Sequence, residues 1–590
     1  MRLVLLREIP EDEQLREQWN ALVMRLDQPQ IFYTFEWALA VQRAYGAVLR
    51  PLVFLSYEGE TLTGVVALAR ETVTGAVSFL CATTGDYCDF LSAPDTNAAF
   101  ISAVVDELRK QKLGEVTLAN LPADSQTVAT LREASRESGY HLFARTAYQC
   151  AQISMAPFRE TEGKAPPLPG TKKLKRCLHT LAREMNVRFD HACSWSAVES
   201  ILPEFTQTHV GRFLLTGRIS NLAARERRVF LAELARLLST RGWLALTRMV
   251  AGDRAIAWNY GFRFAGSWFW YQPTFDSEFE RYSPGTCLLA QIVQEAAHNP
   301  GMHTVDLGLG AEEYKEIFAN RARRTLYVTL RASVGLHVGE MIRYASASAI
   351  KTSPKLENRV RALVAATERL KEKLGRKGLR RLCGQFTERC IDSLWSDTEV
   401  IFFESAGEAL ENHTGRRLQK LSLRELASAV SQYSNDPETC AYLLRSAARL
   451  KRKSAEGFVL VDSNESLLHF AWVTEFQDFF LSELNAKVNA PAENCRMLFD
   501  CWTPAAARGH GYYGKTIAMM AKRVHDAGGK PWIFSAATNA PSIRGLQKAG
   551  FQRRYSLVRQ VRMNLQSIRM KTGLARLDGS VTSQHRSHVA

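Results

Sequence analysis

The hydrophobic and polar positions of the chain repeat one pattern three times. Two apolar runs of strand length flank a polar turn that contains Gly, Asp or Asn, which is typical of a β-hairpin. The three hairpins begin near residues 51, 243 and 457, so their starts lie about 190 and about 215 residues apart. This spacing predicts three domain-sized copies of one unit.

Each hairpin is followed by a similar order of elements. Apolar strands alternate with segments of helical periodicity, which gives a strand, a helix, a strand and a second helix. The first of these helices is predicted near 96–110, 284–298 and 514–527. We therefore expect an α/β (α+β) protein in which a mixed sheet is flanked by helices.

Proline and glycine clusters and shifts in composition set the predicted boundaries. The predicted parts are a first unit without a glycine loop (1–160), a second unit (161–335), a basic helical linker (336–395), a third unit (396–565) and a flexible tail (566–590). The first two units are expected to act as a tandem, which the linker joins to the third.

The positive charge of the chain is concentrated in one stretch. The net charge is +16, and residues 345–381 contain eleven Lys and Arg against three acidic residues. Half of the excess therefore lies in a segment with helical periodicity. Such a segment suits phosphates, lipid headgroups or RNA, and the alternative is a solvated helix between domains.

The remaining composition narrows the class of protein. No apolar run reaches the roughly 18–20 residues of a membrane span, and the apolar start is too short for a secretory signal. The eleven cysteines include no CxxC pair, which predicts reduced thiols and no metal. We expect a cytoplasmic protein, with peripheral contact at the inner membrane face through 345–381 as a further option.

The sharpest motif is a glycine loop between a predicted strand and a predicted helix. It reads Arg508-Gly509-His510-Gly511-Tyr512-Tyr513-Gly514-Lys515. Glycines let the backbone approach a ligand, and the N–H groups of a helix start favour a pyrophosphate, to which Arg508 would add a charge-assisted contact. The loop also matches GxGxxG, but the next strand lacks the acidic residue of a dinucleotide site.

The sequence after this loop resembles the closing motif of the GNAT acyltransferases. It reads Asn539-Ala-Pro-Ser542-Ile-Arg-Gly-Leu-Gln-Lys548-Ala-Gly550-Phe551. The resemblance implies a GNAT domain at 396–565 that uses acetyl-CoA or another acyl-CoA as co-substrate, without a metal. The implied cofactor-binding residues are Arg508, Gly509, Gly511, Tyr512, Gly514, Lys515, Asn539 and Ser542.

Acyl transfer needs a general base for the proton of the attacking amine or hydroxyl. The candidates are Asp500, on the strand before the loop, and His469, on the hairpin; His469 is alternatively a half-buried structural histidine. Many GNAT proteins have a Tyr five residues before the closing Phe, where this chain has Leu546. Tyr513 also occupies a small position of the family's loop, so loss of catalysis in this unit stays open.

Residues 1–335 resemble the FemAB-like tandem-GNAT proteins, and among them the CelD/BcsL (BioF2-like) group of bacterial cellulose and exopolysaccharide synthesis. The resemblance rests on the aromatic segment 31–37, on Tyr271, Asp276 and Ser283-Pro284-Gly285, and on the stretch 306–315. Ser283 and Gly285, at a predicted helix start, are expected to receive an anion. Asp306, Glu312 and Lys315 are the catalytic candidates of this half, and Asp306 could equally cap its loop.

Together these features predict an acyl-CoA-dependent N- or O-acyltransferase. The resemblance implies a sugar or amine acceptor linked to exopolysaccharide or cellulose synthesis. One alternative is an aminoacyl-tRNA-dependent FemAB-like transferase, for which the basic segment 345–381 would suit RNA. Another is a non-catalytic GNAT scaffold of a polysaccharide synthase. The acceptor, the acyl group, the catalytic unit and the oligomeric state stay open.

Overall fold

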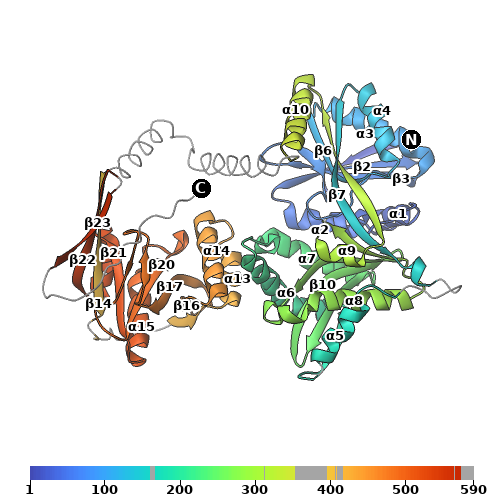
Figure 1. The fold of residues 1–590 in the computed structure, drawn as a ribbon. Coiled ribbons are helices and arrows are strands. Elements are labelled where there is room, and N and C mark those ends of the chain that lie inside the picture. The colour runs from blue at the N-terminus through green and yellow to red at the C-terminus, as the bar shows by residue number, and fades with distance from the viewer. Residues whose placement is uncertain are drawn as a thin grey trace. The chain divides into compact units, whose positions relative to one another are not determined.

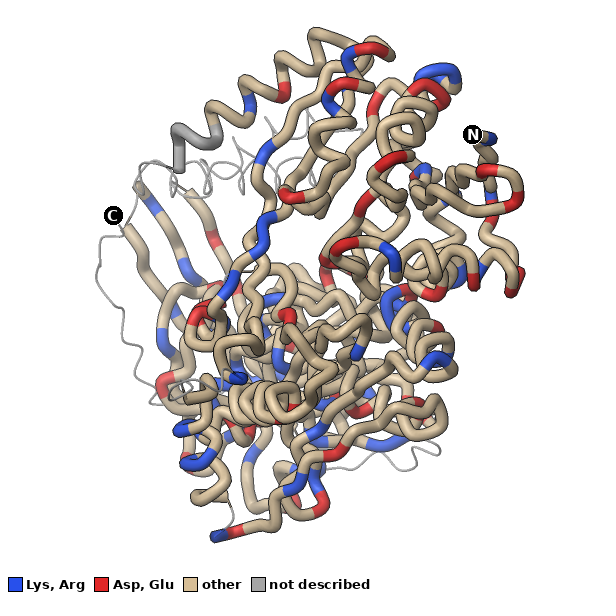
Figure 2. The backbone as a smooth tube through the Cα atoms, turned by 90° about the vertical axis from the view of Figure 1, so that its right-hand side faces the viewer, with Lys and Arg blue, Asp and Glu red and all other residues tan. Residues whose placement is uncertain are grey.

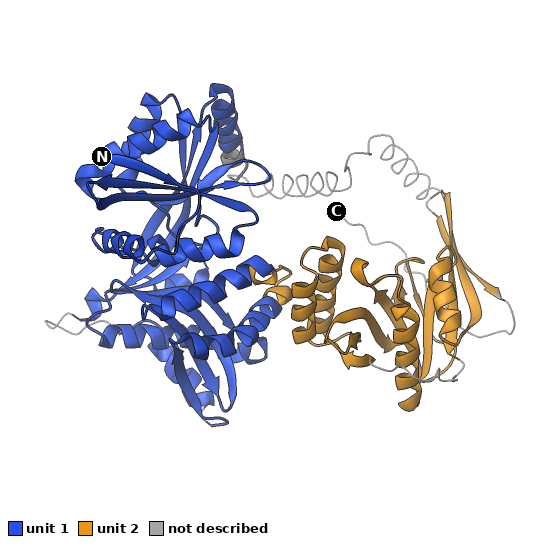
Figure 3. Ribbon diagram, turned by 180° about the vertical axis from the view of Figure 1, so that it is seen from behind, with its two compact units in different colours: residues 1–212, 224–354 blue, residues 213–223, 355–590 orange. Residues whose placement is uncertain are grey.

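The computed structural model describes residues 1–159, 167–181, 183–310, 312–351, 395–405, 407, 416–563 and 565–572. The chain divides into two compact units (Figure 3). The tandem unit contains 1–212 and 224–354, and the C-terminal unit contains 213–223 and 355–590. Within these described ranges, every helix is too short or too polar to span a bilayer.

One 13-stranded sheet runs through the tandem unit (Figure 1). Its order is β1-β2-β3-β4-β6-β13-β7-β12-β11-β10-β9-β8, and β5 pairs with β3. The strands are β1 (Arg2–Leu6), β2 (Leu49–Glu58), β3 (Thr61–Glu71), β4 (Val77–Phe79), β5 (Leu91–Ser92), β6 (Glu115–Pro122), β7 (His141–Ser154), β8 (Val187–Ala192), β9 (Leu244–Ala251), β10 (Arg254–Phe264), β11 (Ser267–Phe275), β12 (Thr304–Leu309) and β13 (Arg321–Arg331).

Helices flank this sheet, as the periodicity predicts. They are α1 (Glu13–Met24), α2 (Phe35–Tyr45), α3 (Pro94–Lys110), α4 (Thr127–Glu137), α5 (Thr171–Leu181), α6 (Trp195–Leu215), α7 (Arg225–Ser239), α8 (Pro284–His298), α9 (Glu313–Phe318) and α10 (Val334–Lys351). The basic segment 345–381 begins within α10, and its remainder lies outside the described residues.

The two halves of the tandem unit exchange their closing strands. β7 ends the first half in sequence, yet it pairs with β12 of the second half. β13 ends the second half and pairs with β6 of the first. The two exchanged strands also pair with each other, Arg321–Arg331 against Gln152–His141. Each half therefore depends on the other to complete its sheet.

Aromatic side chains join the halves beneath the exchanged strands. The ring of Trp37, on α2, lies 5.5 Å from that of Phe230, on α7, and 5.4 Å from that of Phe262, on β10. Phe32 lies 5.5 Å from Phe269 of β11. The aromatic segment that supports the family resemblance therefore forms the apolar core between the halves.

The C-terminal unit contains an eight-stranded sheet of order β15-β16-β17-β20-β21-β14-β22-β23. Its elements are β14 (Trp395–Ser405), β15 (Arg416–Lys420), α13 (Leu423–Gln432), α14 (Pro437–Arg452), β16 (Glu456–Asp462), β17 (Leu467–Glu475), β18 (Phe479–Leu481), β19 (Ala486–Val488), β20 (Cys495–Trp502), α15 (Tyr512–Asp526), β21 (Lys530–Ala536), α16 (Ala540–Lys548), β22 (Phe551–Arg562) and β23 (Leu565–Thr572). Here β14 lies between β21 and β22. In the first tandem half the exchanged strand β13 has the corresponding place between β6 and β7, and in the second half β7 has it between β12 and β13.

The structure confirms the predicted fold class and the predicted hairpins. These are β2–β3, β9–β10 and β16–β17, and each pair is antiparallel. The helices α3, α8 and α15 follow them, as expected. In α15, Ile517, Met520, Ala521 and Val524 form the buried face, which is the stripe that their spacing predicts.

The prediction of a flexible tail from residue 566 is wrong for its first part. Residues 565–572 form β23, which pairs with β22 along its length. The alternation of apolar and polar residues in this stretch, with Ile568 packed on the core, explains the strand. Residues 573–590 lie outside the described part of the chain.

The strand exchange predicts which proline substitution the tandem unit tolerates. Thr325 is fully buried in β13 between β6 and β7. We expect Thr325→Pro to remove a ladder hydrogen bond, leave its buried partner unsatisfied and destabilise the unit by about 1–3 kcal/mol in urea unfolding. Arg2→Pro, at the exposed start of edge strand β1, is the control and should change stability by less than about 1 kcal/mol. Equal effects of the two substitutions would contradict the central position of β13.

Candidate functional site

Parallel strands separate beside one helix start in each of two copies. In the C-terminal unit, β20 and β21 pair only over Cys495–Leu498 and Lys530–Ile533. In the second tandem half, β11 and β12 pair only over Ser267–Phe269 and Thr304–Asp306. Beyond these residues the strands no longer bond to each other, so a ligand group can approach their backbone.

The glycine loop presents bare backbone at the start of α15. Gly511 precedes the helix with φ +71°, and no side chain caps the first turn. A Cβ placed on Gly509 or Gly511 would meet no atom within 4 Å. The first N–H groups of a helix have no partner within the helix, and the helix dipole makes this end positive. The loop therefore offers backbone donors to an anion.

Side chains on either side of the loop are held in place by local contacts. Arg508 donates from Nε to the carbonyl of Thr503 at 3.1 Å, and its guanidinium lies 5.5 Å from the ring centre of Trp502. The ring of Tyr512 stacks on that of His510 at 5.5 Å. Lys515 is half-buried in the first turn of α15. An anion at the helix start would thus have Lys515 and Arg508 near it, and Arg508 also lies 3.7 Å from a carboxylate oxygen of Glu438.

Three predicted cofactor residues connect α15 with α16. A Cβ on Gly514 would lie 3.4 Å from the carbonyl oxygen of Gly545, so this glycine allows the two helices to approach. Asn539 caps α16 by accepting from the N–H of Ser542 at 3.1 Å. The hydroxyl groups of Ser542 and Tyr513 lie 2.9 Å apart. A cofactor contact of Gly514, Asn539 or Ser542 stays a prediction.

His469 is a buried, neutral histidine. Its Nδ1 lies 2.7 Å from the hydroxyl of Thr503, and its ring packs 5.8 Å from that of Tyr513 on α15. Burial lowers the pKa of His469 to about 3. Its Nε2 is buried and has no hydrogen-bond partner in the described part of the chain. This atom can accept a proton only weakly.

Asp500 faces away from His469. Its carboxylate accepts from Arg449 of α14 at 2.6 Å, and its backbone carbonyl accepts from Tyr442 at 3.1 Å. The contacts place Asp500 toward α14 and His469 toward α15. The two alternative bases therefore have different surroundings, and the role of either one stays a prediction. Leu546 is fully buried in the core.

The second tandem half also has a helix start without a side-chain cap. Ser283 precedes α8 with φ +53°, and its side chain makes no capping hydrogen bond. A Cβ on Gly285 would lie 3.3 Å from the ring of Phe275. The predicted anion site at Ser283 and Gly285 thus shares its backbone geometry with the loop before α15, although Pro284 supplies no N–H.

Asp306 lies at the end of the paired part of β12 and is buried. One carboxylate oxygen accepts from the N–H of Gly308 at 2.8 Å, which is the loop cap considered from the sequence. The other accepts from Tyr87 at 3.0 Å and from Gln152 at 2.8 Å. Tyr87 belongs to the first half and Gln152 to the exchanged strand β7. The site is therefore shared by both halves.

Lys315 and Glu312 form an ion pair just after β12. Their N···O distance is 2.8 Å, and Lys315 also donates to the carbonyl of Leu309 at 2.7 Å. Lys315 is buried, whereas Glu312 is exposed. The structure thus gathers Asp306, Glu312 and Lys315 near the end of β12.

The sequence analysis missed Asp86, which the first half contributes to the same place. A Cβ on Gly308 would lie 2.4 Å from its carboxylate and 3.8 Å from the carbonyl of Trp270 on β11. Asp86 therefore lies where β11 and β12 separate. Burial, followed by the charge of Asp306, raises the pKa of Asp86 from 3.8 to about 7. A carboxyl group that titrates near neutral pH suits general acid–base chemistry.

Residues 170–316 match the family model of an acetyltransferase (GNAT) domain. The chain contains a GNAT domain. The domain covers roughly a quarter of the chain and includes α8, β11, β12 and Asp306. The resemblance to the GNAT superfamily is thereby confirmed, whereas the CelD/BcsL group stays a prediction. Within the described residues, no three His, Cys, Asp or Glu side chains are placed to share a metal ion.

Several solved structures are similar to the chain that holds this GNAT domain. The C-terminal domain of a protein named as a lysylphosphatidylglycerol synthetase from Agrobacterium fabrum has 13% identity and a TM-score of 0.36, covering 56% of this chain and 94% of its own. FemX has 9% identity and a TM-score of 0.38, and the match covers 58% of this chain and 100% of FemX. A tandem GNAT protein of clavulanic acid biosynthesis has 13% identity and a TM-score of 0.34, and the match covers 56% of this chain and 98% of that protein. No curated protein matches the sequence.

The pKa of Asp86 predicts a pH-dependent effect of Asp86→Asn. The folded pKa lies above the unfolded value, so this group's stabilisation is complete below about pH 4 and is lost as the pH rises through about 7. We expect the stability advantage of Asp86→Asn over the native chain to grow by roughly 2–3 kcal/mol between pH 5 and pH 8. Thermal unfolding at both pH values tests this.

The exposed Asp106 provides the matched control for this experiment. Asp106→Asn should shift the thermal midpoint equally at pH 5 and pH 8. An advantage of Asp86→Asn that stays constant between the two pH values would show that Asp86 titrates outside this range.

Proposed function

We propose that the protein is an acyl-CoA-dependent N- or O-acyltransferase, with acetyl-CoA as the simplest donor. The acceptor is an amine or hydroxyl, and the family resemblance favours a sugar or amine of exopolysaccharide or cellulose synthesis. The observation that carries the proposal is the uncapped helix start beside separating parallel strands. It occurs at α15 and again at α8, within the matched GNAT domain.

In this proposal, each of the two helix starts is a separate donor site. At α15, the N–H groups after Gly511 hold the pyrophosphate, with Arg508 and Lys515 as neighbouring cations. At α8, the backbone after Ser283 has the same task. Backbone N–H groups of the separated strands polarise the thioester carbonyl. The nucleophile attacks that carbonyl and the C–S bond breaks. The departing CoA thiolate then takes up the proton that the nucleophile gave up to the base, so that CoA leaves as its thiol.

The proton of the nucleophile passes to a carboxylate of the tandem unit. Asp86 lies at the opening between β11 and β12, and the neighbouring Asp306 supports a pKa near neutrality. Lys315 offsets part of the negative charge of this pair. We expect Asp86→Asn to lower the rate of CoA release by roughly 10²–10⁴-fold at pH 7.5, because general base catalysis contributes about that much.

Calorimetric titration of acetyl-CoA into the full chain tests donor binding. Gly511→Glu places a bulky negative group at the start of α15, and Gly285→Glu does so at α8. We expect two saturable sites in the native chain and the loss of one in each variant, with a weakening of at least about tenfold.

Gly528→Glu is the control for Gly511→Glu. Gly528 follows the other end of α15, has φ +75° and also has open space around its Cβ position. The two substitutions therefore introduce the same charge and a similar backbone strain. Native binding in all three variants would refute donor binding at the helix starts. Loss in Gly285→Glu alone would restrict acyl-CoA to the GNAT domain.

A further inference from the structure

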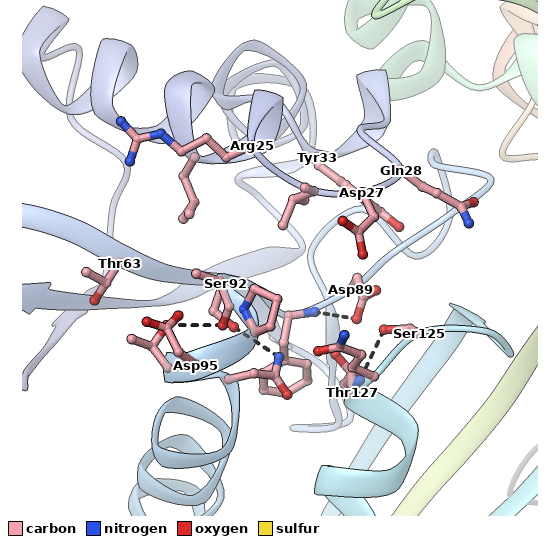
Figure 4. A pocket seen from close by; sticks show the side chains of 18 of the residues that line it. Arg25, Asp27, Gln28, Tyr33, Thr63, Asp89, Ser92, Asp95, Ser125 and Thr127 are labelled. Carbon is pink, nitrogen blue, oxygen red and sulfur yellow. Dashed lines mark hydrogen bonds between the residues drawn. The ribbon is translucent and has the colours of Figure 1, made fainter. Parts of the chain in front are cut away.

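A separate cavity lies within the first half of the tandem unit (Figure 4). Its volume is about 280 Å³, and it is lined by the end of α1, the start of β3 and the first turns of α3 and α4. No part of the GNAT domain lines it. A cavity of this size suits a metabolite rather than a cofactor as large as CoA, because sites for drug-sized ligands begin at about 300 Å³.

The charges around this cavity are mainly negative. Arg323 is engaged by Asp124, whose carboxylate accepts from its Nε at 3.0 and 3.2 Å. The other charged residues of the lining are Arg25, Asp27, Glu58, Asp89 and Asp95. Among the described residues, none of these four carboxylates takes part in an ion pair. Four carboxylates thus face a single remaining cation, a surplus that attracts a positively charged ligand.

The same surplus excludes a phosphate. The first turn of α3 would be a site for an anion, but it already contains the carboxylate of Asp95. The cavity therefore differs in chemistry from the helix starts of α8 and α15.

A buried phenol supplies the second indication of a ligand. Tyr33 lines the cavity and its side chain is only 7% exposed, and no hydrogen bond from its hydroxyl to another described residue is found, so this hydroxyl opens onto the cavity. The side chains of Tyr33, Asp27 and Asp89 point toward one another across the cavity (Figure 4). A hydroxyl that opens onto a cavity from a buried ring is held in one place, so it can exchange water for a hydrogen bond to a ligand.

Asp89 is the innermost carboxylate and is held in position. It accepts from the N–H of Phe90 at 2.8 Å, and the hydroxyls of Ser125 and Thr127 favour its ionised form. Burial raises the pKa of Asp89 to about 6, so the carboxylate is largely ionised at pH 7.5. A cation that replaced water at this point would stabilise the buried charge.

We propose that this cavity binds an organic ammonium ion, such as the end of an alkyl diamine or polyamine, with Asp89 and Asp27 as counter-ions and Tyr33 as hydrogen-bond partner. An extended cation fits better than a metal ion, because no three carboxylates of the described cavity lining converge on one point. The site is independent of acyl transfer, and it would place an amine in the half that lacks a glycine loop.

Titration of the full chain with 1,4-diaminobutane at pH 7.5 and constant ionic strength tests the proposal. We expect saturable one-site binding of the diamine and none of 1,4-butanediol, which has the same length without charge. Asp89→Asn should weaken binding at least tenfold, and Tyr33→Phe about threefold. The exposed Asp106→Asn serves as the matched control and should bind as the native chain does.

Three outcomes would overturn the proposal. They are absence of diamine binding, equal binding in the native chain and both cavity variants, and binding of Mg²⁺ from MgCl₂ in place of the diamine. If Asp89→Asn fails to fold, Tyr33→Phe decides, because it retains the ring. Acetyl-CoA binding measured on the same samples separates this site from the donor sites, since the cavity variants should leave it unchanged.

Discussion

The hydrogen-bonded pairing of β7 with β13 is the contact on which the tandem unit depends. It places a strand of each half inside the sheet of the other. It also fixes which side chains of these strands point to the junction of the two halves. Gln152, on β7, reaches Asp306, and Arg323, on β13, reaches Asp124 and lies over the ring of Tyr87. A shift of one residue would turn these side chains to the opposite face. The site at the junction therefore exists only in this register.

Local sequence signals predicted the parts of the fold that local chemistry decides. The hairpins, the helices after them and the glycine turn before α15 all follow from periodicity and turn residues within short windows. The exchange of β7 and β13 does not, because an alternating strand carries no mark of its partner. Likewise, the short alternation around Ile568 does not show that it forms a strand until β22 is placed beside it.

In the candidate site, too, the sequence predicted what is local along the chain and not what the packing of the two halves brings together. Asp306, Glu312 and Lys315 lie within ten residues of one another, and their grouping at a strand end is a local property. Asp86 lies more than two hundred residues earlier in the chain, and only the packing of the two halves brings it to Gly308. Its raised pKa comes from burial and from Asp306, and neither cause is visible in the sequence around it. The surroundings of the alternative bases His469 and Asp500 were equally hidden from local sequence, because they come from α15 and α14, which are distant along the chain from one or both of them.

β14 of the C-terminal unit is synthesised before its neighbours in the sheet, whereas the exchanged strand β13 is synthesised long after its neighbours β6 and β7. β14 precedes the sheet that it completes, so it is available as soon as β21 and β22 are made. The first tandem half must wait for β13, which follows the end of β7 by roughly 170 residues. At about 5–20 residues per second, the edges of β6 and β7 remain open for roughly ten to thirty seconds on the ribosome. Nascent chains of the tandem unit therefore pass through a stage in which open strand edges need protection from other chains.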